Sequence, residues 1–100
     1  MKNLKNNLSE EDTLINKNLG MWLRKERKKS YILKDGKKKP ITQTMIAKKL
    51  GVTFQQIQKY EKGTNSISSL KLWKFCELTE TDLMWFFEPF KNHKLTNGRE

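Results

Sequence analysis

Residues 42–63 read TQTMIAKKLGVTFQQIQKYEKG and predict two short helices joined by a tight turn at Gly51. Thr42 is a suitable N-cap for the first helix and Thr53 for the second. Gly63 is a natural C-terminal stop. The apolar positions that we expect the first helix to bury are Met45, Ile46, Ala47 and Leu50. Two short helices at this spacing are typical of a helix-turn-helix.

The second helix has two chemically different faces when its residues are placed at about 100° intervals, with Gln55 as zero. The polar residues within about 60° of that zero are Gln58, Lys59 and Lys62. The opposite side, at about 140–200°, holds Thr53, Ile57 and Tyr60. Phe54 lies at about 260°, where it either packs or touches thymine methyl groups. Amides pair with adenine edges and lysines with guanine edges or phosphates, so the polar face predicts a helix in a DNA major groove.

The charge of the whole chain agrees with a polyanionic partner. The formal net charge is +10 at pH 7 and the sequence pI is about 9.8. Residues 21–39 hold nine Lys or Arg against two acids, a net +7, whereas residues 71–88 hold two lysines against four acids, a net −2. This separation suits a protein that meets nucleic acid on one side, although a lysine-rich surface can also be merely solvated.

Several other classes of protein find no support in the sequence. The single cysteine, Cys76, lies in an apolar pattern, which indicates a small core residue in a reduced compartment and no disulfide framework. No apolar stretch approaches the ~18–20 residues that span a bilayer, and the N-terminus lacks the apolar core of a signal peptide. The single histidine, His93, has no partner at the spacing of a metal site or a nucleophile–base pair. We therefore expect a cytoplasmic, nucleoid-associated protein without enzymatic activity, cofactor, metal, membrane association or small-molecule ligand.

Apolar spacing along the chain predicts a compact all-α domain of five helices over residues 12–90, between a disordered arm (1–11) and a disordered tail (91–100). Helix 1 is expected to begin at Asp12 or Thr13. Its apolar stripe comprises Ile15, Leu19, Trp22 and Leu23. Gly20 within it either permits close helix packing or is incidental. Helix 4 is expected to begin near Ser68 or Ser69 and to bury Leu70, Trp73 and either Phe75 or Cys76. Helix 5 is expected at residues 82–90.

Residues 30–41, SYILKDGKKKPI, form a basic insertion that is less regular than its surroundings. Asp35-Gly36 is a strong turn dipeptide and Tyr31-Ile32-Leu33 favours extended structure, so the segment predicts either a small hairpin or an extension of helix 1 followed by a turn. Its lysine run, Lys37, Lys38 and Lys39, is either solvated or in contact with DNA phosphates.

The string FQQIQKYEKGTN at residues 54–65, followed by Ile67-Ser68, resembles the lambda-repressor-like helix-turn-helix family of Cro/C1 or XRE type, which occurs in bacteria and phages. The similarity runs from Leu19 to Glu88 and is interrupted by the long link between helices 1 and 2. It implies a five-helix domain that binds a pseudo-palindromic operator as a homodimer. The base-reading residues that it implies are Phe54, Gln55, Gln58 and Lys59. The expected contacts to the DNA backbone come from Gln43, Thr53, Lys62 and Asn65, joined by Lys37, Lys38 and Lys39 of the insertion. Tyr60 and Glu61 would be structural.

The C-terminal segment is rich in aromatic residues and offers a surface for self-association. The expected dimer residues are Leu83, Trp85, Phe86, Phe87 and Phe90, which could alternatively all fold inward. Together these features predict a transcriptional regulator that binds double-stranded DNA sequence-specifically and acts, most simply, as a repressor. One alternative is an antitoxin-type, partner-binding module whose helix-turn-helix autoregulates its own promoter. The other is an RNA-binding protein, which the expected burial of most aromatic residues disfavours.

Overall fold

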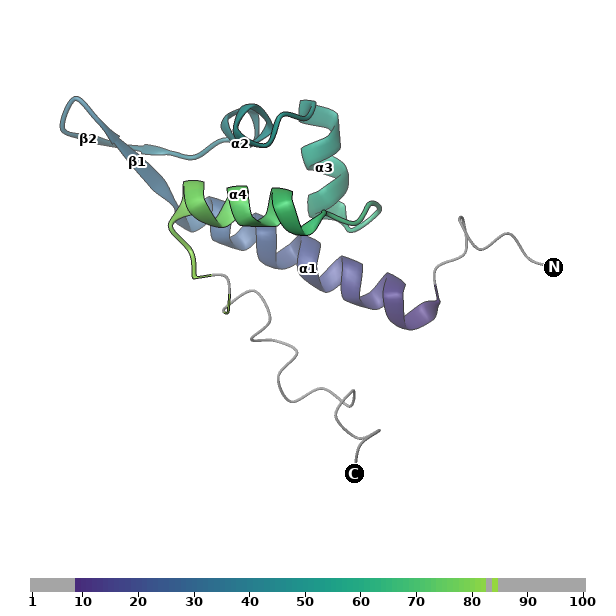
Figure 1. The fold of residues 1–100 in the computed structure, drawn as a ribbon. Helices are drawn as coiled ribbons and strands as arrows, with labels where there is room; N and C mark the ends of the chain where they lie inside the picture. Colours follow the sequence, from purple (N-terminus) through teal and green to yellow (C-terminus); the bar gives the residue numbers. More distant parts are fainter. Residues whose placement is uncertain (1–8, 83, 85–100) are drawn as a thin grey trace.

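Four helices and one β-hairpin make up the residues described by this computed structural model, 9–82 and 84. In chain order the elements are α1 (Glu10–Lys29), β1 (Tyr31–Lys34), β2 (Lys37–Pro40), α2 (Gln43–Leu50), α3 (Phe54–Lys62) and α4 (Ser69–Thr79). α3 packs on α1 and α2, and α4 packs on α2. In Figure 1 α2 lies between the hairpin and α3, and the hairpin projects away from the helices. The two helices predicted within residues 42–62 are confirmed.

Each helix begins where a hydroxyl side chain accepts a hydrogen bond from the backbone N–H three residues later. The predicted caps Thr42 and Thr53 are confirmed, with distances of 3.2 and 3.0 Å. Helix 4 begins where expected, with Ser68 as its cap at 3.2 Å. The expected start of helix 1 at Asp12 or Thr13 is wrong, because Ser9 caps α1 and the helix includes residues 10 and 11 of the expected arm. The first turn of α1 is acidic, which favours this earlier start through the helix dipole.

The segment that the sequence left open is a hairpin, so the expectation of an all-α fold is wrong for the described residues. β1 and β2 pair antiparallel, with Tyr31 opposite Pro40 and Lys34 opposite Lys37. The chain reverses at Asp35 and Gly36, which have φ angles of +54° and +75°. Two consecutive left-handed residues match the right-handed twist of the flanking strands. The fifth helix, expected at 82–90, falls mainly outside the described residues.

The core is formed by one side of each helix together with the residue that joins the hairpin to α2. Ile41 and Ile46 have the two largest fully buried side chains. The other buried residues are Leu23, Ala47, Leu50, Ile57, Tyr60, Leu72, Phe75 and Cys76. Met45, which we expected to be buried, packs against this core but stays partly exposed. The expected burial of Leu70 and Trp73 is wrong, since these side chains are 60% and 55% exposed. α4 instead buries positions 72, 75, 76 and 79, a spacing that lies along a single helix face.

Cys76 is a core residue, as predicted. Burial, followed by the negative charges of Asp82 and Glu26, raises the pKa of its thiol to about 11. The side chain therefore stays protonated near neutral pH and packs as a small apolar group.

None of the described helices is long and apolar enough to cross a membrane.

Two glycines set the distance between α1 and α3. A Cβ atom on Gly20 would lie only 2.5 Å from the carbonyl oxygen of Tyr60 and 2.6 Å from that of Glu61, so a larger residue would push the helices apart. Gly63 ends α3 with a φ of +78°, and a Cβ atom there would lie 2.6 Å from the Cα atom of Lys17. Close helix packing at Gly20 is confirmed, and it lets the C-terminal half of α3 lie close to α1.

Candidate nucleic-acid interface

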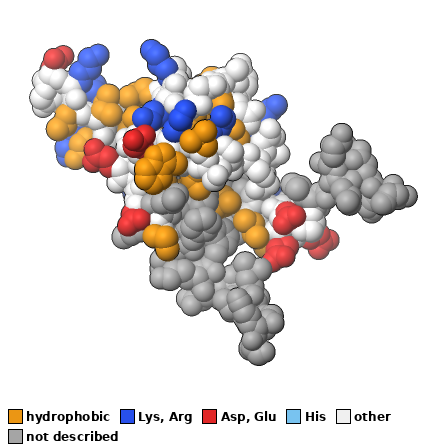
Figure 2. Space-filling view, viewed as in Figure 1, with side chains coloured by type: hydrophobic (Ala, Val, Ile, Leu, Met, Phe, Trp, Pro, Cys, Tyr) orange, Lys and Arg blue, Asp and Glu red, His pale blue; other side chains and the backbone are white. Residues whose placement is uncertain are grey.

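Basic side chains gather on one part of the face shown in Figure 2. In Figure 2 Lys and Arg side chains lie mainly over the upper part of the domain, around the hairpin, α2 and α3. Acidic side chains in that view lie at the hairpin tip, near the end of α4 and at the start of α1. A basic surface interrupted by few acids is the electrostatic footprint of a nucleic-acid-binding domain.

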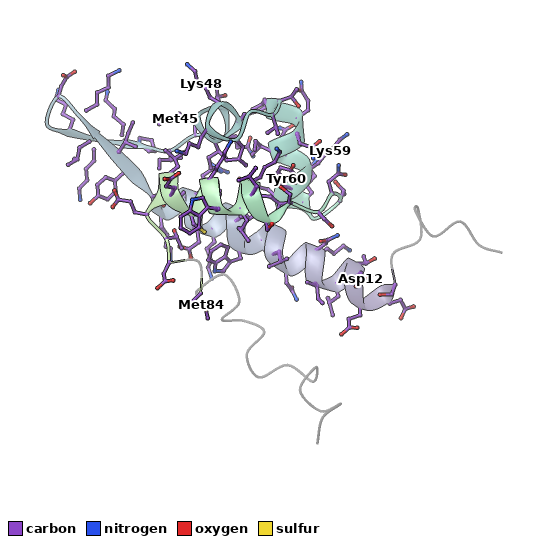
Figure 3. All side chains as sticks on the ribbon, in the orientation of Figure 1. Asp12, Met45, Lys48, Lys59, Tyr60 and Met84 are labelled. Carbon is purple, nitrogen blue, oxygen red and sulfur yellow. The ribbon has the colours of Figure 1, made fainter. Side chains whose placement is uncertain are left out.

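α3 presents two faces, as its helical periodicity predicts. Ile57, Tyr60 and Glu61 are buried, whereas Gln55, Lys59 and Lys62 are exposed. Gln58 is half-buried, consistent with its place at the margin of the polar face. In Figure 3 Lys59 points away from the domain, whereas Tyr60 lies between α3 and the remaining helices. The exposed face is thus a strip of amide and ammonium groups on a helix whose other face is packed.

Phe54 stands at the start of this strip with 41% of its surface exposed. It is the first residue of α3, directly after the N-cap Thr53. The tight turn before it has Gly51 at a φ of +73°, and the N–H of Val52 donates to the carbonyl of Ala47 at 3.0 Å. Phe54 and the following residue, Gln55, are thus both exposed at the start of α3.

A buried ionic network holds α3 in place. Glu61 on α3 accepts two hydrogen bonds from the Arg27 guanidinium of α1, at 2.6 and 3.1 Å, and one from the Gln43 amide of α2, at 2.8 Å. The side chains of Arg27 and Glu61 are only 13% and 6% exposed. Because one carboxylate receives donors from two other helices, the network ties α1, α2 and α3 together.

The loop after α3 is closed by hydrogen bonds to the end of the helix. The N–H of Thr64 donates to the carbonyl of Lys59 at 3.0 Å, and the Ser66 hydroxyl donates to the Asn16 side chain on α1 at 3.1 Å. Asn65 lies between these two anchors and is exposed, as is Lys62 at the end of α3. The loop thus presents both residues beside the exposed face of α3.

The match to a known family comes from the same part of the chain. A family model described as helix-turn-helix matches residues 37–86, half of the chain, and includes both α2 and α3. The chain belongs to the helix-turn-helix family of XRE/Cro-C1 type. The resemblance inferred from the sequence is confirmed.

Curated relatives of this helix-turn-helix protein carry related descriptions. An uncharacterized HTH-type transcriptional regulator of Sinorhizobium medicae is 42% identical over 48 residues, which are 48% of this chain and 34% of that protein. Another from Sinorhizobium fredii is 40% identical over 59 residues, covering 59% and 41%. A Rhodospirillum rubrum protein, named as an uncharacterized transcriptional regulator in the ATPase CF(0) region, is 40% identical over 51 residues, covering 51% and 47%. The matched part of the chain spans less than half the length of each of these relatives.

The predicted site residues that the structure describes lie on β2, at the starts of α2 and α3, along α3 and in the loop that follows it. Gln43 lies at the start of α2, Thr53 at the start of α3, and the lysine run lies on β2 just before α2. All three lysines of that run are exposed, and the Lys38 ammonium sits 4.5 Å from the centre of the Tyr31 ring. The five expected dimer residues, Leu83, Trp85, Phe86, Phe87 and Phe90, lie outside the described residues.

Sequence reasoning missed the role of Arg27. It counted this residue only among the nine Lys or Arg residues of the 21–39 segment. The signal was Glu61, a carboxylate on the packed side of α3, because a buried acid needs a cation or several donors. Periodicity alone does not select Arg27 over its basic neighbours, since the choice depends on how α1 is rotated against α3.

Proposed function

We propose that this protein is a sequence-specific regulator of transcription that binds double-stranded DNA through α3. The observation that carries the proposal is the pairing of a packed face, held by the Arg27–Glu61–Gln43 network, with an exposed face of amide and ammonium groups. A helix held in this way can lie in a major groove with its base-reading groups in defined positions.

Base reading is assigned to the exposed strip of α3. We assign to Gln55 the paired hydrogen bonds that an amide makes to adenine, and to Lys59 a hydrogen bond donated to guanine. Phe54, exposed at the beginning of the helix, suits contact with thymine methyl groups. Gln58 is half-buried, so we assign it the margin of the contact.

Phosphate contacts are assigned to residues around this strip, and two of them keep a donor after their internal hydrogen bond is made. The Gln43 amide has two N–H groups and gives one to Glu61. The Thr53 hydroxyl accepts from the N–H of Gln56 at 3.0 Å and retains its own hydrogen. Both donors suit a phosphate oxygen, as do the exposed side chains of Lys62 and Asn65.

The proposal includes a homodimer that reads a pseudo-palindromic operator. Two recognition helices would have to sit about 34 Å apart, one turn of DNA. The proposed pairing surface is the aromatic segment at residues 83–90. A dimer that covers a promoter would act as a repressor. We expect it in the cytoplasm, associated with the DNA of the nucleoid. Light scattering should give the mass of a dimer for the protein alone and of a monomer for a folded Trp85→Ala/Phe86→Ala/Phe90→Ala variant.

The test of base reading is a binding selection from a random duplex library, followed by affinity measurements on the selected site and on a scrambled duplex. Gln55→Ala should weaken binding to the selected site by ~1–3 kcal/mol and leave the scrambled duplex nearly unaffected. Lys62→Ala is the control, since loss of a phosphate contact should weaken both complexes similarly and reduce the salt slope by about one. Equal losses on both duplexes for Gln55→Ala would remove base reading by α3 from the proposal.

A further inference from the structure

We propose that the β-hairpin is a DNA-binding wing that lays one face, the one bearing Lys34, Lys37 and Lys39, against phosphates outside the half-site read by α3. This inference rests on the proposed function, because it names a second surface of the same protein–DNA complex. That surface would extend the contact beyond the bases read by α3. It also divides the lysine run by role, since Lys38 belongs to the other face.

The strand register separates the hairpin lysines. Residues directly opposite in an antiparallel pair share a face, and successive residues alternate between faces. Ile32 pairs with Lys39 and Lys34 pairs with Lys37, so these four side chains lie on one side, the wing face. Leu33 pairs with Lys38 and Tyr31 pairs with Pro40, so these four lie on the other side.

The two faces differ in charge and in what their lysines already contact. The wing face carries three ammonium groups, and its one apolar side chain, Ile32, packs against the core. The opposite face carries one ammonium group, on Lys38, and this group lies over the Tyr31 ring. Tyr31 and Leu33 are 49% and 69% exposed, so this face is largely apolar. Phosphates are attracted more strongly to the face with three cations.

The base of the hairpin is fixed to the domain, so the wing face has a defined direction. Ile41, which follows β2, is 2% exposed, and its N–H donates to the carbonyl of Ser30 at 3.3 Å. The Ser30 hydroxyl donates to the carbonyl of Glu26 on α1 at 2.6 Å. α2 starts two residues after Ile41, with Gln43, the proposed phosphate donor. The hairpin therefore leaves the domain beside the proposed contact to the DNA backbone, with α3 on the other side of α2 (Figure 1).

A side-on approach fits the charges better than insertion of the tip. Asp35 occupies the turn and would bring a carboxylate to the phosphates if the tip entered first. Lying side-on, the wing face offers Lys34, Lys37 and Lys39 along its length. Four residues at roughly 3.3 Å each reach about 13 Å, which corresponds to at most about four base pairs of flanking DNA.

The test compares Lys39→Ser with Lys38→Ser, two neighbouring and exposed positions that lose the same charge on opposite faces. Affinities are measured at low salt on a duplex that ends at the selected site and on one extended by several base pairs at each end. On the extended duplex Lys39→Ser should weaken binding roughly three- to tenfold and reduce the salt slope by about 0.9, whereas Lys38→Ser should change affinity less than about twofold. On the short duplex both variants should bind like the unaltered protein.

A Lys34→Ser/Lys37→Ser/Lys39→Ser variant, checked for folding by circular dichroism, should bind the extended duplex no more tightly than the short one. It should keep its preference for the selected site over a scrambled duplex. Equal effects of Lys38→Ser and Lys39→Ser would overturn the assignment of faces. Unchanged DNA affinity together with altered self-association of the free protein would identify the hairpin as a protein interface and overturn the wing. An unaltered protein that binds the selected site and a scrambled duplex of the same length equally would instead contradict the proposed function, while the difference between the two hairpin faces would still be measurable on extended duplexes.

Discussion

α3 and the β-hairpin both offer exposed lysines on either side of α2, but they are held in very different ways. α3 is packed along one whole face, with Ile57 2% exposed and Glu61 bound by groups from α1 and α2. The hairpin is held at its base, through Ile32 and Ile41, while residues 33–40 are all exposed. One element is positioned over its full length and the other only where it leaves the domain.

This difference matches the two kinds of DNA contact that we propose. Hydrogen bonds to base edges depend on side chains held within about 0.5 Å of their working positions, so a base-reading helix needs support from its own core. Contacts to phosphates carry no sequence information and depend mainly on charge, so a hairpin fixed at one end is sufficient. Three substitutions should sharpen or break this comparison.

The largest effect is expected for Glu61→Ala, which removes the acceptor at the centre of the α3 support. The Arg27 guanidinium, with a side chain only 13% exposed, would lose its carboxylate, and the free energy of unfolding should fall by about 3–5 kcal/mol. Urea denaturation measures this loss. Glu77→Ala is the control, because the Lys49–Glu77 pair at 3.1 Å is largely exposed and should contribute under ~1 kcal/mol. Similar losses in both variants would mean that the buried network does not support α3.

A smaller effect is expected for Gly20→Ala, which acts on the same support from α1. Its methyl group would lie 2.5 Å from the Tyr60 carbonyl oxygen, so α1 and α3 would have to separate, at a cost of about 1–3 kcal/mol. Sequence preference on DNA should weaken as well, because α3 would shift. Asn18→Ala, at an exposed position of the same helix, should change stability by only a few tenths of a kcal/mol. A stability equal to that of the unaltered protein would show that the close approach at Gly20 is not required.

The smallest effect is expected for Gly36→Ala in the hairpin turn. This residue has a φ of +75° with open space around it, so only backbone strain of about 1 kcal/mol should result. Gly51→Ala is a matched control, with a φ of +73° and equally open space, but it lies in the turn that orients α3. We expect both variants to lose similar stability and only Gly51→Ala to lose sequence preference in DNA binding. A loss of preference in Gly36→Ala would mean that the hairpin also takes part in base reading.

Much of the helix-turn-helix could be predicted from sequence because its signals are local. Thr42, Thr53 and Ser68 cap their helices through residues three positions away, and Gly63 ends α3 in the left-handed conformation. The 3.6-residue period alone separated the packed and exposed faces of α3. These features depend on a few consecutive residues, so no knowledge of the rest of the fold was needed.

The remaining features depend on how the helices are placed against one another. α4 contains apolar residues on more than one side, so its sequence did not show that Phe75 and Cys76 are buried while Trp73 remains exposed. The choice of Arg27 as the partner of Glu61 depends on how α1 is rotated against α3, at the close approach that Gly20 permits. The 30–41 segment could form a hairpin or a longer helix as judged from its residues. Burial of Ile41 and the packing of Ile32 against the core favour the hairpin, because these contacts exist only once α1 and α2 have come together.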